Sequence, residues 1–499
     1  MSQTTKWPAA SRGRFPKREL RAAWIATVDH IDWPPKGVVD PEQQKREFVD
    51  LLEQLKSVGI NAVIVQIRPT SDAFYPSKLV PWSEWLTGKQ GTDPGYDPLA
   101  FMLEEAHLRN MEFHAWFNPY RVSLQDEVGR LADNHPARRI GVIPYGGKLY
   151  FDPGDPFARE HIIECIMEVV EAYDIDAVHF DDYFYPYPVV GVDFPDEETY
   201  RRYGRTYADK ADWRRSNVNL FVKEISRRIK EAKRHVKFGI SPFGIWRNKS
   251  EDPNGSDTEG LSGYDALFAD AKWWVEDPDI KLDYIIPQLY WPLGTPAVSY
   301  DKLANWWRQV TGNRDIHLYA GHALYKVGSM NADEWADPEQ LPNQIIFNRV
   351  DGSVKGSAFF SARWFAENRL GVTDRLKNDL YAYPALVPPM PWIDRKPPAP
   401  PVLESVVESE EGVRLTWTST DDDAAYDVIY RFEGEGIGDV EDPRCMVGAV
   451  RRRPGTLHGR KKCSYVDTTA RKGRRYTYVV TSADRTHNES APSNAMTLL

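Results

Sequence analysis

Two adjacent aspartates, Asp181 and Asp182, stand at the end of a short apolar run that begins at Ala177. Neighbouring carboxylates raise each other's pKa, because ionising both places two like charges side by side. One of them can then keep a proton while the other is negative, and glycoside hydrolysis needs such a pair. We therefore predict that Asp181 and Asp182 are catalytic. The competing interpretation is that they cap the following loop in an Asx turn.

Aromatic, amide and guanidinium side chains recur at the ends of the other predicted strands. Rings stack on the faces of sugars, and planar amide or guanidinium groups hydrogen-bond to adjacent hydroxyls, so this mixture is typical of a glycan cleft. The residues predicted to bind the substrate are Trp24, Arg68, Asp72, Trp116, Asn118, Tyr120, Arg121, Tyr183, Tyr185, Trp246, Arg247, Gln288, Tyr290, Trp291, His322, Arg363 and Trp364.

Some of these residues also have structural interpretations that the sequence leaves open. Arg68 could form an ion pair with Asp72 instead of contacting a ligand, and Arg121 could satisfy the backbone of its own loop. Gln288 and Tyr290 alternate on one face of a strand, so we expect at least one of them in the core. The hydroxyl of Tyr290 would suit the carbonyl of an N-acetyl group.

Tryptophan is unusually frequent, with 17 residues in the chain. One core does not need so many, because each indole must also place its N–H group. Nine of the 17 fall at predicted strand ends or in the loops that follow them: Trp24, Trp33, Trp82, Trp85, Trp116, Trp246, Trp291, Trp335 and Trp364. This concentration predicts an aromatic rim around one cleft.

Short β-branched runs alternate with amphipathic segments between residues 20 and 381. Strands are predicted at 20–28, 60–68, 112–118, 177–181, 237–242, 283–289, 316–320 and 356–361, and helices at 41–58, 97–110, 156–173, 211–234, 264–276, 299–311, 338–350 and 374–381. Strict alternation of eight strands and eight helices predicts an α/β fold, the (β/α)₈ barrel, whose active sites lie at the C-terminal ends of the strands. The sequence contains neither GxGxxG nor a Walker motif, which argues against a nucleotide site.

The composition changes after residue 383. Eight prolines between 384 and 401 predict a stiff, extended linker. In residues 402–499 the apolar period becomes two, in short runs separated by turn residues, which predicts a small all-β immunoglobulin-like sandwich. The predicted organisation is a catalytic barrel in residues 1–383, the linker in 384–401 and the sandwich in 402–499.

Composition excludes several classes of protein. A hydrophobic fraction of 41% is enough for a packed core, and a net charge of −10 without a long basic run argues against a nucleic-acid partner. The sequence has no run of 18 apolar residues to span a membrane, and its three cysteines fit no zinc motif, so no metal or cofactor is predicted. The first residues lack an apolar leader, which predicts a cytoplasmic protein if this N-terminus is native and a secreted or envelope protein if a signal was removed. The oligomeric state stays open.

Seven motifs in order resemble the bacterial glycosyl-hydrolase-like family 10. They lie at residues 21–28, 31–34, 66–73, 86–88, 94–99, 114–121 and 179–186. The resemblance spans about residues 17–381. It implies a barrel hydrolase of a bacterial or related polysaccharide, with an N-acetylated glycan such as peptide-free peptidoglycan as the favoured substrate. Trp417 and residues 426–431, 465–467, 476–480 and 490–493 resemble the landmarks of a fibronectin type III domain.

Two mechanisms are open for such a hydrolase. In the first, one aspartate is a nucleophile and the other an acid, which retains the anomeric configuration. In the second, which resembles chitinase-type enzymes and is favoured here, Asp182 is the acid. Asp181 then orients an N-acetyl group that itself attacks, and Tyr290 steadies that group.

Two alternatives to this function remain. One is a non-catalytic glycan-binding protein with the same aromatic cleft, and the other is a hydrolase of a neutral glucan. An amylase-type enzyme would need a glutamate at the end of the fifth strand, and residues 241–248 contain none.

Overall fold

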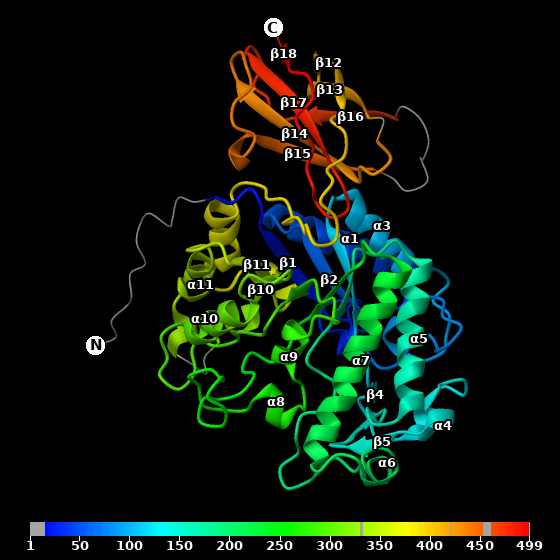
Figure 1. Ribbon diagram of the computed structural model, residues 1–499. Coiled ribbons are helices and arrows are strands. Elements are labelled where there is room, and N and C mark those ends of the chain that lie inside the picture. Colours follow the sequence, from blue (N-terminus) through cyan, green and yellow to red (C-terminus); the bar gives the residue numbers. More distant parts are fainter. Residues whose placement is uncertain (1–14, 330–332, 420, 453–460, 499) are drawn as a thin grey trace.

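Eight parallel strands close into a barrel in the computed structural model, which describes residues 15–329, 333–419, 421–452 and 461–498 (Figure 1). Their order around the barrel is β1-β11-β10-β9-β8-β7-β3-β2. The bounds are β1 Leu20–Ile25, β2 Ala62–Arg68, β3 Glu112–Phe117, β7 Ala177–Phe180, β8 Lys237–Ile240, β9 Tyr284–Ile285, β10 His317–His322 and β11 Val354–Phe359. The predicted (β/α)₈ fold is confirmed.

Helices follow the barrel strands and pack around the outside of the barrel. They are α1 Pro41–Val58, α3 Pro98–Leu108, α5 Pro156–Ala172, α7 Lys210–Ala232, α9 Ala271–Glu276, α10 Tyr300–Thr311, α11 Gln340–Asn348 and α13 Val372–Arg375. Three of them begin with the same sequence signal, an aspartate followed by proline. The side chains of Asp40, Asp97 and Asp155 each accept a hydrogen bond from a backbone N–H of the first turn. Proline fits at the next position because its missing N–H would have no partner there.

One barrel unit differs from the prediction. The helix expected at 264–276 is divided into α8 Gly263–Ala266 and α9, and the strand expected at 283–289 is reduced to the two residues of β9. Pro287 follows this strand closely. Because proline has no backbone N–H to donate, a regular ladder does not continue through it.

The long loops at the C-terminal ends of the strands carry further elements that periodicity did not predict. A small antiparallel sheet of β4 Arg121–Ser123, β5 Ile143–Tyr145 and β6 Lys148–Tyr150 follows β3. Short helices are α2 Glu84–Thr87, α4 Ala137–Ile140, α6 Glu197–Tyr203 and α12 Arg363–Glu367. Segments of three to seven residues are too short to show a period.

The C-terminal part is a small sandwich of two antiparallel sheets, as predicted. One sheet has the order β12-β13-β16 and the other β15-β14-β17-β18. The bounds are β12 Val402–Ser409, β13 Gly412–Ser419, β14 Tyr426–Glu433, β15 Met446–Arg451, β16 Lys461–Asp467, β17 Tyr476–Ala483 and β18 Met496–Leu498. Trp417 of the first sheet and Ile429 and Tyr478 of the second pack in one buried cluster. The fibronectin type III assignment and the domain boundaries stay predictions.

The proline-rich segment between barrel and sandwich is packed against both. Val387, Met390 and Ile393 are buried in a cluster with residues of the barrel, and Leu386 is buried in a cluster of the sandwich. Residues 384–401 contain no helix, in agreement with the prediction, but eight of these 18 residues are buried.

The sandwich covers the end of the barrel where the strands begin (Figure 1). Glu112, the first residue of β3, contacts Lys237 and lies 2.6 Å from Nε2 of His487 in the sandwich. Asp176 precedes β7 and accepts a hydrogen bond of 2.8 Å from Arg451 of β15. Burial disfavours both charges, but the neighbouring cations outweigh it and hold the pKa of Glu112 and of Asp176 well below their usual values. The two parts are therefore joined by buried, compensated charges.

In the described part of the chain, no helix is long and apolar enough to cross a membrane.

Candidate active site

A cavity of about 440 Å³ opens at the end of the barrel opposite the sandwich, where the strands finish. It is lined by Trp24, Ala26, Val28, Ile31, Gln66, Trp116, Arg121, Asp181, Asp182, Tyr183, Tyr187, Ser241, Phe243, Gln288, Tyr290, Trp291, Tyr325, Lys326 and Phe360. Each barrel strand, or the loop after it, contributes at least one of these residues. The predicted catalytic pair lies among them.

Asp181 follows directly after β7 and is held by three N–H groups. Its Oδ2 accepts from the indole of Trp116 at 3.0 Å and from the amide of Asn118 at 3.1 Å. Its Oδ1 accepts from the backbone N–H of Tyr183 at 3.0 Å. The carboxyl is therefore fixed by β3 and by its own loop, with only 6% of the residue exposed.

Asp182 is held by a different set of groups. Its Oδ1 accepts a hydrogen bond of 2.8 Å from the side-chain amide of Gln288, and its Oδ2 contacts the hydroxyl of Tyr187. Only 3% of Asp182 is exposed. The turn after β7 therefore brings both neighbouring carboxyls to one cavity, although consecutive residues of a regular strand point to opposite faces.

The cavity disfavours the charge on both aspartates. Burial raises the pKa of both aspartates, and because the two carboxyls share one cavity, ionisation of either one disfavours ionisation of the other. The guanidinium of Arg121 opposes both shifts. The pair consequently holds a proton at a higher pH than two isolated aspartates would.

A chain of hydrogen bonds inside the barrel supports the cavity floor. The indole N–H of Trp24 donates to Nε2 of His179 at 3.3 Å. Nδ1 of His179 lies 3.1 Å from the hydroxyl of Tyr284, which lies 2.9 Å from Nδ1 of His114. Nε2 of His114 reaches Glu112 at 2.9 Å. Because the indole of Trp24 can only donate, Nε2 of His179 accepts and its Nδ1 carries the proton. Nδ1 of His179 therefore donates to the hydroxyl of Tyr284, which donates to His114, and Nε2 of His114 donates to the carboxylate of Glu112.

Residues 19–337 match the protein family described as glycosyl hydrolase-like 10. The chain belongs to this family. A relative named glycosyl hydrolase YngK, from Bacillus subtilis (strain 168), is 49% identical over 490 residues, which cover 96% of this chain and 93% of the relative. Glycosyl hydrolase DigH from Escherichia coli (strain K12) is 42% identical over 364 residues, which cover 68% of this chain and 82% of that protein.

Solved structures that match the chain include the PgaB (BpsB) glycoside hydrolase domain from Bordetella bronchiseptica. Its TM-score is 0.45 at 15% sequence identity, with 72% of this chain and 98% of that domain covered. The sequence resemblance to the glycosyl hydrolase-like 10 family is thus confirmed by the family match and by the two relatives.

In this member of the glycosyl hydrolase-like 10 family, the structure brings nine of the predicted site residues together at the cavity. They are Asp181, Asp182, Trp24, Trp116, Arg121, Tyr183, Gln288, Tyr290 and Trp291. Their functional roles stay predictions. Gln288 and Tyr290 both line the cavity, so the expectation that at least one of them lies in the core is not met.

Four predicted binding residues lie in a layer behind the cavity instead. Asn118 reaches Asp181, and Arg68 donates to the carbonyls of Asn118 and Pro119 at 3.2 and 3.0 Å. Asp72 bonds to neighbouring polar side chains and forms no ion pair with Arg68, contrary to one interpretation. Tyr120 is fully buried against the helix layer. These residues can position the loop after β3 but do not line the cavity.

The remaining six predicted binding residues lie away from the cavity, in contacts that explain them structurally. Their partners are Asn217 for Tyr185, Trp306 for Trp246, Asp265 for Arg247, Gln344 and Ser357 for His322, the carbonyl of Ile31 for Arg363, and Arg369 for Trp364. None of the six lines the cavity, because a position near a strand end does not fix the direction of a side chain, and their binding roles stay predictions.

The aromatic rim is narrower than predicted. Of the nine tryptophans expected there, three line the cavity: Trp24, Trp116 and Trp291. Trp33 and Trp335 are buried in the core, and Trp82 and Trp85 pack against it. The cavity is completed by rings that were not predicted, among them Tyr187, Phe243 and Phe360. Tyr187 lies in the same aromatic run as Tyr183, and that run was the available signal.

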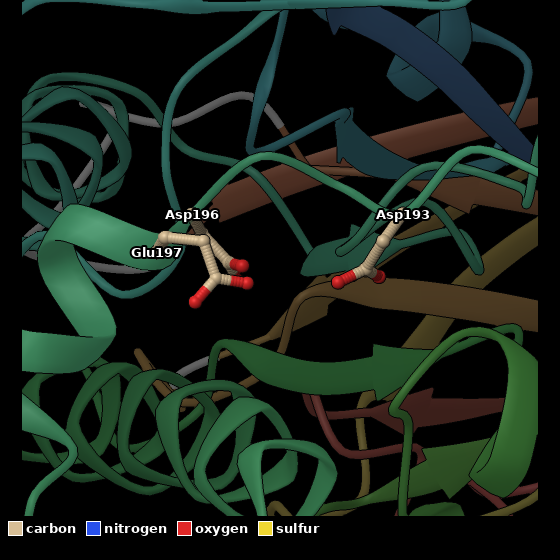
Figure 2. Close-up of side chains that lie close together, drawn as sticks. All are labelled: Asp193, Asp196 and Glu197. Atoms are coloured by element: carbon tan, nitrogen blue, oxygen red, sulfur yellow. The ribbon is translucent and has the colours of Figure 1, made fainter.

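Two clusters of three carboxylates lie outside the cavity. Asp193, Asp196 and Glu197 point toward one another at the start of α6 (Figure 2). Lys210 and Arg214 already form ion pairs with this cluster, at 2.9 Å from Lys210 to Asp196 and 2.8 Å from Arg214 to Asp193. The second cluster is Asp394, Asp423 and Asp484, near the junction with the sandwich. Neither cluster is assigned to a metal.

Proposed function

We propose that the protein is a glycoside hydrolase of an N-acetylated glycan, such as peptide-free peptidoglycan, with Asp182 as the general acid. Family membership and two relatives named glycosyl hydrolases support the reaction class. The observation that carries the mechanism is the different chemistry of the groups around the two aspartates.

The partners of Asp181 are N–H groups, which can only donate hydrogen bonds. Both oxygens of Asp181 therefore accept hydrogen bonds, which favours the ionised carboxylate over the protonated acid. Asp182 instead meets a hydroxyl at Oδ2, and a hydroxyl can accept as well as donate. When the pair shares one proton, that proton is best placed on Asp182.

An ionised Asp181 supports a substrate-assisted mechanism. The carbonyl oxygen of the sugar's acetamido group attacks the anomeric carbon while Asp182 gives its proton to the departing oxygen. Asp181 stabilises the positive charge that develops on the acetamido group. Water then attacks the anomeric carbon, and the bond between that carbon and the acetamido oxygen breaks. A proton of the water returns to Asp182, the acetamido group is regenerated, and the product retains its configuration.

Tyr290 is placed to hold that acetamido group. It lines the cavity with both aspartates, and its hydroxyl has no hydrogen-bond partner among the described residues. A phenol in this setting can donate to the acetamido carbonyl. Trp24, Trp116 and Trp291 provide faces for the sugar rings.

Removal of the acetyl group from the substrate tests this mechanism. We expect de-N-acetylated glycan strands to be cleaved at least about 100-fold more slowly than the parent strands, because the attacking oxygen is absent. Chemical re-acetylation of the same strands should restore the rate. Equal rates on both preparations would contradict substrate assistance and favour direct attack by an aspartate.

The pH dependence of activity should report the titration of the proton that Asp181 and Asp182 share. Activity is expected to fall as the pH rises through the raised pKa of the pair, because Asp182 then loses its proton. In Asp181→Asn the neighbouring charge is gone, so the pKa of Asp182 falls and the alkaline limb of kcat/KM should move to lower pH. Profiles of both proteins over pH 4–9 measure this shift. If the alkaline limb of kcat/KM stays at the same pH in Asp181→Asn, the assignment of Asp182 as the acid beside an ionised Asp181 is contradicted.

A further inference from the structure

Lys326 is a cation without an acidic partner in the proposed glycan cavity. It lies in the turn Leu324–Lys326 after β10 and lines the cavity. Its Nζ donates to the backbone carbonyl of Tyr290 at 2.8 Å, which uses one of its three N–H groups. Among the residues that the structure describes, no carboxylate lies within ion-pair distance of it. Burial lowers the pKa of Lys326, and no neighbouring acid opposes this effect.

Several other buried cations in this protein have acids beside them, whereas Arg68 is held by two backbone carbonyls. Arg21 pairs with Glu19 at 2.8 Å, and Arg451 pairs with Asp176 at 2.8 Å. The chain also has more acids than bases, 73 against 63, so acidic partners are not scarce. A half-buried ammonium without a counter-charge costs free energy, and a neutral donor could equally serve one carbonyl. An incoming anion would compensate this charge.

A second cation faces the cavity from the opposite side of the barrel. Arg121 follows β3, which stands four places from β10 in the ring of eight strands, and the aspartate pair follows β7 between them. Nε and Nη2 of Arg121 donate to the carbonyl of Pro69 at 3.1 and 3.0 Å. Arg121 offsets the charge of the aspartates, whereas Lys326 has no such neighbour.

We propose that Lys326 binds a carboxylate carried by the glycan, so that the cavity selects acidic over neutral N-acetylated sugars. The inference rests on the proposed function and names the substrate class within it. In peptide-free peptidoglycan, every second sugar carries a lactyl ether whose carboxylate could serve as this ligand. Chitin-type glycans have the same acetamido groups but no such charge.

The test compares one glycan with and without its charge. Peptide-free strands are prepared with free lactyl carboxylates and, in parallel, with these carboxylates converted to amides. The unsubstituted protein, Lys326→Gln and Lys302→Gln are compared by kcat/KM on both preparations. Lys302 is the control outside the cavity. Its Nζ also donates to a backbone carbonyl, that of Pro296 at 2.7 Å, but it pairs with Asp257 at 3.1 Å and does not line the cavity.

We expect the unsubstituted protein to prefer the charged strands by about tenfold in kcat/KM, the usual contribution of one charge-assisted hydrogen bond. Lys326→Gln should remove most of this preference, and Lys302→Gln should keep it. The preference should also weaken as salt is added. An equal loss on both preparations, or a preference unchanged in Lys326→Gln, would overturn the inference.

A binding experiment distinguishes a failure of this inference from a failure of the proposed function. Quenching of tryptophan fluorescence measures the affinity of each strand preparation for Asp182→Asn. If charged strands bind more tightly than amidated strands, and the difference is lost when Lys326→Gln is added to Asp182→Asn, charge selection is supported even if the unsubstituted protein releases no product. That absence of product would contradict the proposed function alone. Equal binding of both preparations would overturn the inference itself.

Discussion

Asp182→Asn is expected to lower kcat on the glycan substrate by about 10³-fold or more. The amide has nearly the same shape and can still meet Gln288 and Tyr187, but it cannot give a proton to the departing sugar. General acid catalysis contributes about 10²–10⁴-fold in enzymes. Steady-state release of reducing ends measures the loss, and binding of the strands should change much less than the rate.

Asp72→Asn is the matched control for this variant. Asp72 is also buried, and burial raises its pKa to about 6, but it lies behind the cavity and not in it. We expect its kcat to stay within about tenfold of the unmodified protein, as for other changes outside the chemistry. Similar losses in both variants would show that the rate follows packing and not proton transfer. Retention of full activity by Asp182→Asn would remove Asp182 from the mechanism.

Asp176→Ala is expected to lower the free energy of unfolding by about 3–5 kcal/mol, because it leaves buried cations without their counter-charge. Asp176 accepts from Arg451 of the sandwich at 2.8 Å and from His107 of α3 at 2.7 Å. Chemical denaturation followed by fluorescence measures the change. Because this carboxylate joins barrel and sandwich, we also expect both parts to unfold in one transition.

Asp174→Ala provides the comparison two residues away. Asp174 pairs with Arg485 of the sandwich, but 37% of its side chain is exposed. Its loss should cost less than about 1 kcal/mol, as for other exposed ion pairs. If the two variants are equally stable, or if barrel and sandwich unfold separately, the buried charges do not join the two parts as described.

Much of the fold follows from local sequence signals. The helix predicted at 41–58 has those bounds in the structure, because Asp40 and Pro41 mark its start and Gly59 takes a left-handed conformation at its end. The apolar run at 60–68 likewise predicts β2. The strand predicted at 283–289 is longer than β9, because the regular ladder is interrupted at Pro287 and continues only as isolated bridges at Gln288.

The cavity was less predictable than the barrel. The position of Asp181, Trp116 and Gln288 at or just after the end of a strand correctly predicts that they lie at one end of the barrel, since parallel strands finish at the same level. It could not show that the ring of His322 packs between Tyr300 and Phe359, on the side of the helices. Whether a side chain turns inward depends on the tilt of its strand and on packing between distant residues, which one sequence does not specify.

The central claim is that this cavity cleaves an N-acetylated glycan. Mass analysis of the products from peptide-free peptidoglycan, chitin oligosaccharides and a neutral glucan tests it most directly. We predict that peptide-free peptidoglycan, alone or together with the chitin oligosaccharides, yields new reducing ends that carry an N-acetylated sugar. The neutral glucan should yield none. Binding of these glycans without release of any product would contradict the claim and favour a glycan-binding protein.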